Sequence, residues 1–155
     1  MDLVSELASV TSALHGAGVP YALCGGIAVT LHGHVRATKD IDLLVLPEDR
    51  ERALGVVAPL GYDVPALPMT FGAGTPGERL VQRVTKFEAG ESLTVDFLLV
   101  GPVFEAVWAS RENYLWEGSV LCVVSRAGLL EMKRLAGRAQ DLADVERLES
   151  EPEDA

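Results

Sequence analysis

Basic residues are scarce in this sequence. Its 155 residues include 13 Lys and Arg against 23 Asp and Glu, which gives a formal net charge of -10. Non-specific binding to a nucleic acid depends on clustered Lys and Arg side chains that displace counterions from phosphates. We therefore expect no extended DNA binding, and any contact with nucleic acid must be local.

Cysteines and long apolar runs are scarce as well. Cys24 and Cys122 are the two cysteines, and each lies in an apolar strand-like run, where a thiol usually behaves as a small buried hydrophobe. We expect neither a disulfide nor a zinc site. No apolar run approaches the roughly 20 residues of a membrane-spanning helix. The first ten residues, MDLVSELASV, also lack the basic region of a signal peptide. The sequence predicts a cytoplasmic protein without a membrane partner.

The length and composition fit one domain. Hydrophobic residues make up 48% of the chain, and a chain of this size can bury a core without metal or disulfide support. We expect a single domain over residues 1–148. Residues 149–155 are mostly Glu and Asp, a composition that predicts a disordered acidic tail.

Helix-type and strand-type patterns are mixed along the chain. Apolar residues recur at helical spacing over residues 3–14, and two further helices are expected over 127–135 and 140–148. Residues 62–77, rich in Pro and Gly, predict a weak strand and a mobile loop. The clearest strand-like runs are residues 21–24, 40–46, 79–87, 92–100 and 120–124. Together these patterns predict an α+β fold, with a mixed sheet of about five strands flanked by helices and a C-terminal helix pair.

A glycine pair follows the first strand-like run. Gly25 and Gly26 lie between residues 21–24 and a helix expected through about His32. Glycines at a strand-to-helix turn allow a tight backbone and the close approach of another group. Backbone amides at the start of a helix carry partial positive charge and bind phosphate oxygens. An ordinary turn is the alternative, because most Gly-Gly pairs are simply turns.

Three aspartates form the second candidate feature. Asp40 and Asp42 are two residues apart on an expected strand, so their side chains point to the same face. Alone they fit a polar edge strand equally well. Asp96, however, stands within the apolar run SLTVDFLLV, where an unpaired buried carboxylate would be costly. If the two strands are neighbours, three carboxylates converge, enough to hold two Mg²⁺ ions about 3.5 to 4 Å apart for phosphoryl displacement.

These motifs resemble a known enzyme superfamily. Tyr21 to Val45 resembles the DNA polymerase beta-like nucleotidyltransferases, in which a Gly-Gly or Gly-Ser turn precedes an Asp-x-Asp strand and a third Asp lies on a later strand. The segments GGIAVTLHG, RATKDIDLLV and LTVDFLLV are similar to its small bacterial branch. That branch includes minimal nucleotidyltransferases, antibiotic nucleotidyltransferases and the nucleotidyltransferase toxins of abortive-infection systems.

The resemblance implies a nucleotidyltransferase fold over residues 1–148 and assigns roles to the motifs. Asp40 and Asp42 would bind the metal ions, Mg²⁺ or Mn²⁺. Asp96 would complete the metal site and activate the attacking hydroxyl, so that all three act in catalysis. Gly25 and Gly26 would hold the triphosphate of an NTP.

Arg36 and Thr38 match the positions that flank the acidic pair in this branch. The resemblance implies that Arg36 pairs with a phosphate and that Thr38 braces the turn. Their alternative roles are structural, as a salt-bridge residue and a capping residue.

The C-terminal segment SRAGLLEMKRLAGRAQDLADVERL carries a second resemblance. It is similar to the closing helix pair of the abortive-infection toxins, in which a Lys, an Arg and Asp residues face the nucleotide. The matching positions here are Lys133, Arg138, Asp141 and Asp144. A flexible ammonium group suits a phosphate. The alternative is an amphipathic helical hairpin with solvated charges.

Two functions from different classes follow. The first is a metal-dependent enzyme that moves a nucleoside monophosphate from an NTP to a hydroxyl acceptor, releasing pyrophosphate. The acceptor could be a tRNA end, a protein side chain or a small molecule such as an antibiotic. The second is a catalytically silent module of the same fold that binds a nucleotide or a partner protein, for example as one component of a toxin-antitoxin pair with a cognate antitoxin.

Overall fold

The computed structural model describes residues 1–34 and 39–150 and has the predicted α+β class. Its helices are α1 (Leu3–Gly16), α2 (Gly25–Leu31), α3 (Arg50–Val57), α4 (Glu105–Ala109), α5 (Arg126–Ala136) and α6 (Ala139–Glu149). Its strands are β1 (Ala22–Cys24), β2 (Asp40–Val45), β3 (Tyr62–Pro65), β4 (Met69–Phe71), β5 (Arg79–Glu88), β6 (Glu91–Leu99), β7 (Glu112–Trp116) and β8 (Ser119–Val123). Short 3-10 helices cover Pro47–Asp49, Ala58–Leu60 and Pro102–Phe104.

One mixed sheet organises the fold. Its strands follow the order β3-β5-β6-β2-β1-β8-β7, and β4 pairs with the outer part of β5. β2 runs parallel to β6 and antiparallel to β1, while β8 runs parallel to β1. The predicted mixed sheet is confirmed, although the described residues form eight strands where about five were expected.

The additional strands lie at the edges of the sheet. β3 and β4 come from residues 62–77, where the sequence predicted only a weak strand and a loop. In β3 only Tyr62 is buried, and β4 buries none of its three residues. A strand with so few buried positions has no alternating apolar pattern, and so the sequence carries little sign of it.

The β5–β6 hairpin fixes the register of the central strands. Ala89 and Gly90 form its two-residue turn and both have positive φ, 51° and 80°, as such tight hairpin turns require. This turn sets Arg83 opposite Asp96. The two strand-like runs over 79–87 and 92–100 therefore form a hairpin, and its register decides which side chains meet at the centre of the sheet.

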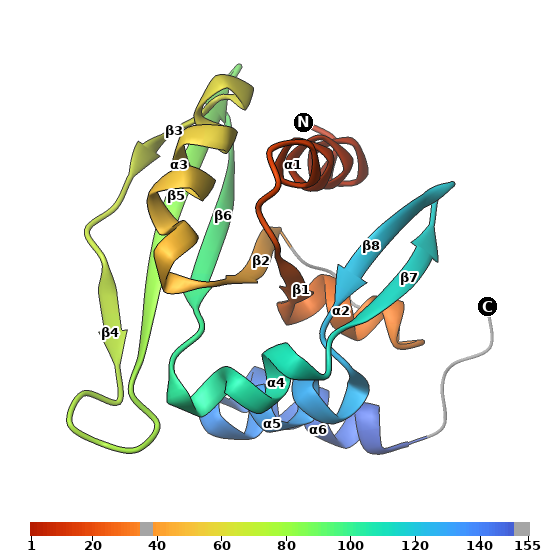
Figure 1. The fold of residues 1–155 in the computed structure, drawn as a ribbon. Coiled ribbons are helices and arrows are strands. Elements are labelled where there is room, and N and C mark those ends of the chain that lie inside the picture. The colour runs from red at the N-terminus through yellow and green to blue at the C-terminus, as the bar shows by residue number, and fades with distance from the viewer. Residues whose placement is uncertain (35–38, 151–155) are drawn as a thin grey trace.

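Helices lie on both sides of the sheet. Figure 1 places α1 at the top of the view and α4, α5 and α6 together at the bottom, with β1 and β2 between the two groups. Leu7, Val10 and Leu14 of α1 are buried, as are Ile41 and Leu43 of β2. Because side chains alternate along a strand, the polar residues of β2 point to the other face. None of the helices in residues 1–34 and 39–150 is long and apolar enough to cross a membrane.

The C-terminal helix pair begins and ends at capping residues. The Ser125 hydroxyl accepts a hydrogen bond from the Gly128 amide at the start of α5, and Gly137 ends that helix with φ 66°. At the start of α6, Asp141 accepts from the Arg138 amide. The predicted helices over 127–135 and 140–148 are thus confirmed. α6 extends to Glu149, and residues 151–155 of the predicted tail lie outside the described residues.

Candidate active site

The centre of the site is a pair of aspartates on neighbouring strands. Asp42 of β2 and Asp96 of β6 are register partners in the parallel ladder. Both line a cavity of about 420 Å³ between the sheet and α5, a size typical of ligand pockets. The structure thus brings Asp96 beside the acidic strand, as the sequence argument required.

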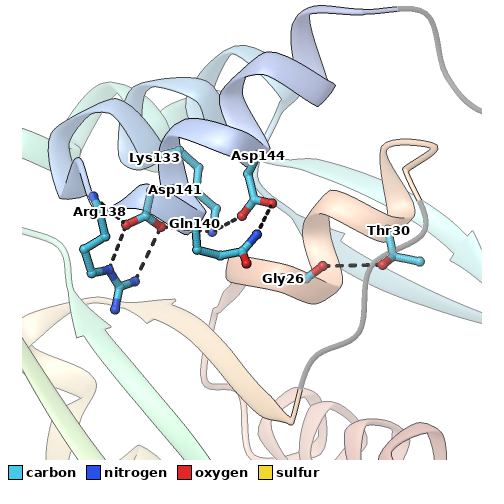
Figure 2. Close-up of polar contacts among 7 residues, drawn as sticks. All are labelled: Gly26, Thr30, Lys133, Arg138, Gln140, Asp141 and Asp144. Atoms are coloured by element: carbon cyan, nitrogen blue, oxygen red, sulfur yellow. Dashed lines mark hydrogen bonds and ion pairs between the residues drawn. The ribbon is translucent and has the colours of Figure 1, made fainter.

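Gly25 forms the wall of the cavity next to Asp42. Its φ is +68°, and a Cβ placed on it would lie 2.0 Å from Asp42 Oδ2. No other residue type allows this approach, because any side chain would overlap the carboxylate. Gly26 is buried within the first turn of α2, and its carbonyl accepts a hydrogen bond of 3.5 Å from the Thr30 hydroxyl (Figure 2). Of the two glycines, Gly25 is the one that reaches the cavity.

Asp42 is a strongly perturbed carboxyl group. Burial raises its pKa to about 7, and the negative charges of Asp96 and Asp40 act in the same direction. Lys133 and Arg83 oppose the shift without cancelling it. Crowding of carboxylates in this way is characteristic of sites that bind a cation or move a proton.

Asp40 takes a different position from the other two acids. It shares a strand face with Asp42, but it is half-buried and is not among the residues that line the cavity. Its Oδ1 accepts a hydrogen bond of 2.8 Å from the hydroxyl of Thr94, its register partner on β6. The structure therefore brings Asp42 and Asp96 together and leaves Asp40 at the margin of the site.

Arg83 is a member of the site that the sequence argument missed. Its Nε and a terminal nitrogen donate to the two carboxylate oxygens of Asp96 at 2.8 and 3.0 Å, and this pairing raises the pKa of the guanidinium. A bidentate Arg–carboxylate pair is geometrically specific. The position of the hairpin turn could have indicated this pair, because a turn at Ala89–Gly90 places Arg83 opposite Asp96.

The three aspartates are suitable ligands for a divalent cation, but their side chains are not arranged around a common metal position. Carboxylate oxygens are the ligands that Mg²⁺ prefers, and a cation would relieve the repulsion that raises the pKa of Asp42. Across residues 1–34 and 39–150, no group of three or more His, Cys, Asp or Glu side chains is arranged to hold a metal ion. For the three aspartates Asp40, Asp42 and Asp96 to share a metal ion, Asp96 would have to give up its contact with Arg83. Asp40 would have to give up its contact with Thr94.

The helix pair forms the opposite wall with a paired set of charges. Lys133 of α5 is buried, and its Nζ lies 3.4 Å from Asp141 Oδ1 and 3.1 Å from Asp144 Oδ2. Figure 2 shows these side chains with Arg138, which binds Asp141 at 2.8 Å, and with Gln140, which donates to Asp144 at 3.2 Å. Burial works to raise the pKa of Asp141, but Arg138 and Lys133 together lower it.

Not all of the predicted helix-pair residues line the cavity. Lys133, Arg138 and Asp141 reach the cavity, whereas Asp144 is fully buried beneath them and holds Lys133 in place. Arg36 and Thr38, the remaining predicted nucleotide-binding residues, lie outside the described residues.

Known structures share this architecture. The lincosamide antibiotic adenylyltransferase LnuA, solved with lincomycin, matches with a TM-score of 0.61 at 17% identity, over 94% of this chain and 96% of its own. A Thermotoga maritima protein assigned provisionally as a nucleotidyltransferase matches with a TM-score of 0.65 at 13% identity, over 93% and 90%. ANT(2″)-Ia, solved with adenylyl-2″-tobramycin, matches with a TM-score of 0.57 at 16% identity, over 94% and 86%. The chain has the nucleotidyltransferase fold.

The likeness to nucleotidyltransferases is one of structure. A comparison with protein-family models finds no match, and neither does a comparison with curated protein sequences. The nucleotidyltransferase fold predicted from Gly25-Gly26 and the three aspartates is thus confirmed by neighbours of low sequence identity.

Proposed function

We propose that the chain is a metal-dependent nucleotidyltransferase that moves a nucleoside monophosphate from an NTP to a hydroxyl group and releases pyrophosphate. The observation that carries this proposal is the Asp42–Asp96 register pair in the cavity floor, with Gly25 held against Asp42. Asp40, Asp42 and Asp96 would hold the Mg²⁺ or Mn²⁺ ions. When bound, such ions neutralise charge that develops on the phosphates and on the attacking oxygen.

The chain's own residues would bind and orient the two substrates. Lys133 and Arg138 line the cavity wall opposite the carboxylates, and cationic groups there would bind the triphosphate. The acceptor oxygen forms a bond to the α-phosphorus while the bond to the bridging oxygen breaks, and pyrophosphate leaves with that electron pair. The hydroxyl proton would pass to a carboxylate oxygen of Asp96 that has given up its contact with Arg83.

Labelled nucleotide provides the direct test. Purified protein is incubated with α-labelled NTPs, Mg²⁺ or Mn²⁺, and three acceptor pools: tRNA, protein, and the antibiotics lincomycin and tobramycin. Label transfer should appear and should fall at least about a hundredfold in Asp42→Asn and in Asp96→Asn. The matched control is Asp63→Asn, an exposed carboxylate on β3 outside the cavity, which should keep full activity. Activity in the Asp42→Asn protein would falsify the proposal.

One observation favours a second candidate, a silent nucleotide-binding module of the same fold. Arg83 occupies both oxygens of Asp96, which is the state expected if a guanidinium replaces the metal permanently. The two candidates differ in how the chain responds to ligands. Thermal stabilisation by NTP that requires Mg²⁺ supports the enzyme, since a ligand at a hundred times its Kd contributes about 2.7 kcal/mol. Stabilisation by NTP alone, without label transfer, supports the silent module.

A further inference from the structure

The cavity continues past the catalytic acids onto an apolar part of the same sheet face. Asp42, Asp96 and Arg83 form one row across β2, β6 and β5. The next row on that face is apolar, and the third row pairs an aromatic residue with a guanidinium. We call these two rows the apolar ledge, which consists of Met69, Phe71, Arg79, Val81 and Leu98.

The register of three strands builds the apolar ledge. Val81 of β5 is the partner of Leu98 on β6 and of Met69 on β4, and Arg79 is the partner of Phe71. Residues two apart on a strand share a face and are separated by roughly 7 Å. The apolar ledge therefore begins about 7 Å from the Asp96 row, which is close enough for one ring of a bound molecule to span.

Apolar groups of α5 lie across the cavity from the apolar ledge. Leu129, Met132 and Ala136 line that wall, so this end of the cavity is a slot with two apolar sides. The β4–β5 turn also contacts α5, where a Cβ on Gly77 would lie only 2.9 Å from Leu135 Cδ1. A slot with two apolar walls favours a flat body over a bulky polar one.

The in-line geometry of phosphoryl transfer indicates which of the two substrates, the NTP or the acceptor, lies in this slot. In phosphoryl transfer the attacking and leaving oxygens lie on opposite sides of the phosphorus. The proposed triphosphate groups, Lys133 and Arg138, lie on the helix pair, and the positive charge of Lys133 acts directly on Asp42. With the leaving pyrophosphate on that side, the acceptor hydroxyl approaches from the β5 and β4 side, across Asp96.

The charges around the slot restrict the acceptor further. Arg79 and Arg83 both line the β5 side of the cavity, and the carboxylate of Asp96 beside them is paired with Arg83. The Arg79 guanidinium lies 5.6 Å from the centre of the Phe71 ring, which is 43% exposed. An exposed ring beside a guanidinium is a stacking surface for an aromatic or apolar ring, and the two arginines oppose a polycation.

We propose that the apolar ledge is the acceptor subsite, and that it takes a hydroxyl compound with a flat apolar or aromatic body that is uncharged or anionic. This assignment rests on the proposed function for the meaning of "acceptor". It excludes acceptors that carry several amino groups. The subsite is formed by residues other than Gly25, Asp42 and Asp96.

A fragment screen by ¹⁹F NMR tests the proposal. The library holds aromatic fragments in three charge classes, uncharged, anionic and cationic, and is screened with and without α,β-methylene-ATP and Mg²⁺. Uncharged and anionic fragments should bind, and they should remain bound when the nucleotide analogue is present. Phe71→Ala should weaken their binding about tenfold, whereas Phe87→Ala, which removes an exposed ring outside the cavity, should leave it unchanged.

A charge reversal supplies a second variant. Arg79→Glu should weaken the binding of anionic fragments and strengthen the binding of cationic ones. Thermal unfolding confirms that the variants are folded. The proposal is overturned if no aromatic fragment binds, if cationic fragments bind best to the unaltered chain, if Phe71→Ala has no effect, or if the nucleotide analogue displaces the fragments. A failure of the proposed function shows separately, as absence of both nucleotide binding and label transfer, because the fragments report on the apolar ledge alone.

Discussion

The two walls of the cavity carry charge in opposite ways. On the helix pair, Lys133 lies between Asp141 and Asp144, and Arg138 binds Asp141 from the outside. On the sheet, Asp40, Asp42 and Asp96 share one face with Arg83, which binds Asp96, while Arg79 lies two rows further along that face beside Phe71. The helix wall is a balanced network, whereas the acids at the centre of the sheet wall outnumber the one guanidinium beside them.

This difference separates charges that already have partners within the fold from charges that stay unbalanced until a ligand binds. A buried ion pair with complete partners gains little net free energy, but removing one partner is costly, because a bare charge remains. An unbalanced cluster costs free energy in the folded state until a ligand compensates it. Mutation should therefore change stability with opposite sign on the two walls.

The largest change in stability is expected from Lys133→Met. The Lys133 ammonium is buried against two carboxylates that are themselves 1% and 0% exposed, Asp141 and Asp144. Methionine fills a similar volume but leaves both negative charges with less compensation. We expect a loss of about 3 to 5 kcal/mol in the free energy of unfolding, measured by urea titration at pH 7.

An exposed pair on the same helices provides the control. Arg134 and Glu149 form an ion pair in which both side chains are more than half exposed, so Arg134→Met should cost no more than about 1 kcal/mol. Adding Asp144→Asn to Lys133→Met should recover part of the loss, since it removes one of the two carboxylates that Lys133 compensates. Equal effects of Lys133→Met and Arg134→Met would contradict the balanced-network interpretation.

On the sheet wall, Asp42→Asn should stabilise the metal-free protein. The pKa of Asp42 is raised from 3.8 to about 7 in the folded chain, so between these values the folded state binds a proton that the unfolded state releases. The wild-type protein therefore loses stability as pH rises from about 4 to about 7, by at most about 4 kcal/mol. The Asn variant lacks this loss and should exceed wild type at pH 8 but not at pH 4.

Urea titrations at several pH values in the presence of EDTA would measure this difference. Asp63→Asn, which changes an exposed carboxylate, should follow the wild-type curve at every pH. Adding Mg²⁺ at pH 8 should stabilise the wild-type protein and leave Asp42→Asn almost unchanged. A variant less stable than wild type at pH 8 would show that Asp42 supports the fold, as the helix-pair charges do.

The sequence predicted the centre of the fold because strong local patterns coincide there. The aliphatic run after Asp40 forms β2, and the two runs around the Ala89–Gly90 turn form a hairpin. An acid isolated in an apolar run, Asp96, correctly indicated a neighbour across the sheet, since a buried carboxylate needs one. Each of these inferences uses a pattern that burial on one face imposes on the chain.

What the sequence did not predict depends on pairing between distant segments. The partners that hold the acids, Arg83 for Asp96 and Thr94 for Asp40, follow from strand register and not from any motif. Edge strands such as β4 bury too little to leave a pattern, and so Phe71 and the apolar ledge were not anticipated. Local sequence indicated where the acids lie, and tertiary packing decided which of them are engaged by other groups.

The smallest stability effect is expected from Arg138→Ala, and it separates binding from folding on the helix wall itself. The Arg138 side chain is 79% exposed, and Asp141 would keep both Lys133 and the backbone amide of residue 138 as partners. The loss should therefore be about 1 kcal/mol or less. If Arg138 contacts the triphosphate, the Kd for NTP measured calorimetrically with Mg²⁺ should rise about tenfold, the value of one charged hydrogen bond. Arg134→Ala, which removes a cation that is 55% exposed and lies outside the cavity, should leave the Kd unchanged; a matching rise in its Kd would point to general charge attraction and remove Arg138 from the site.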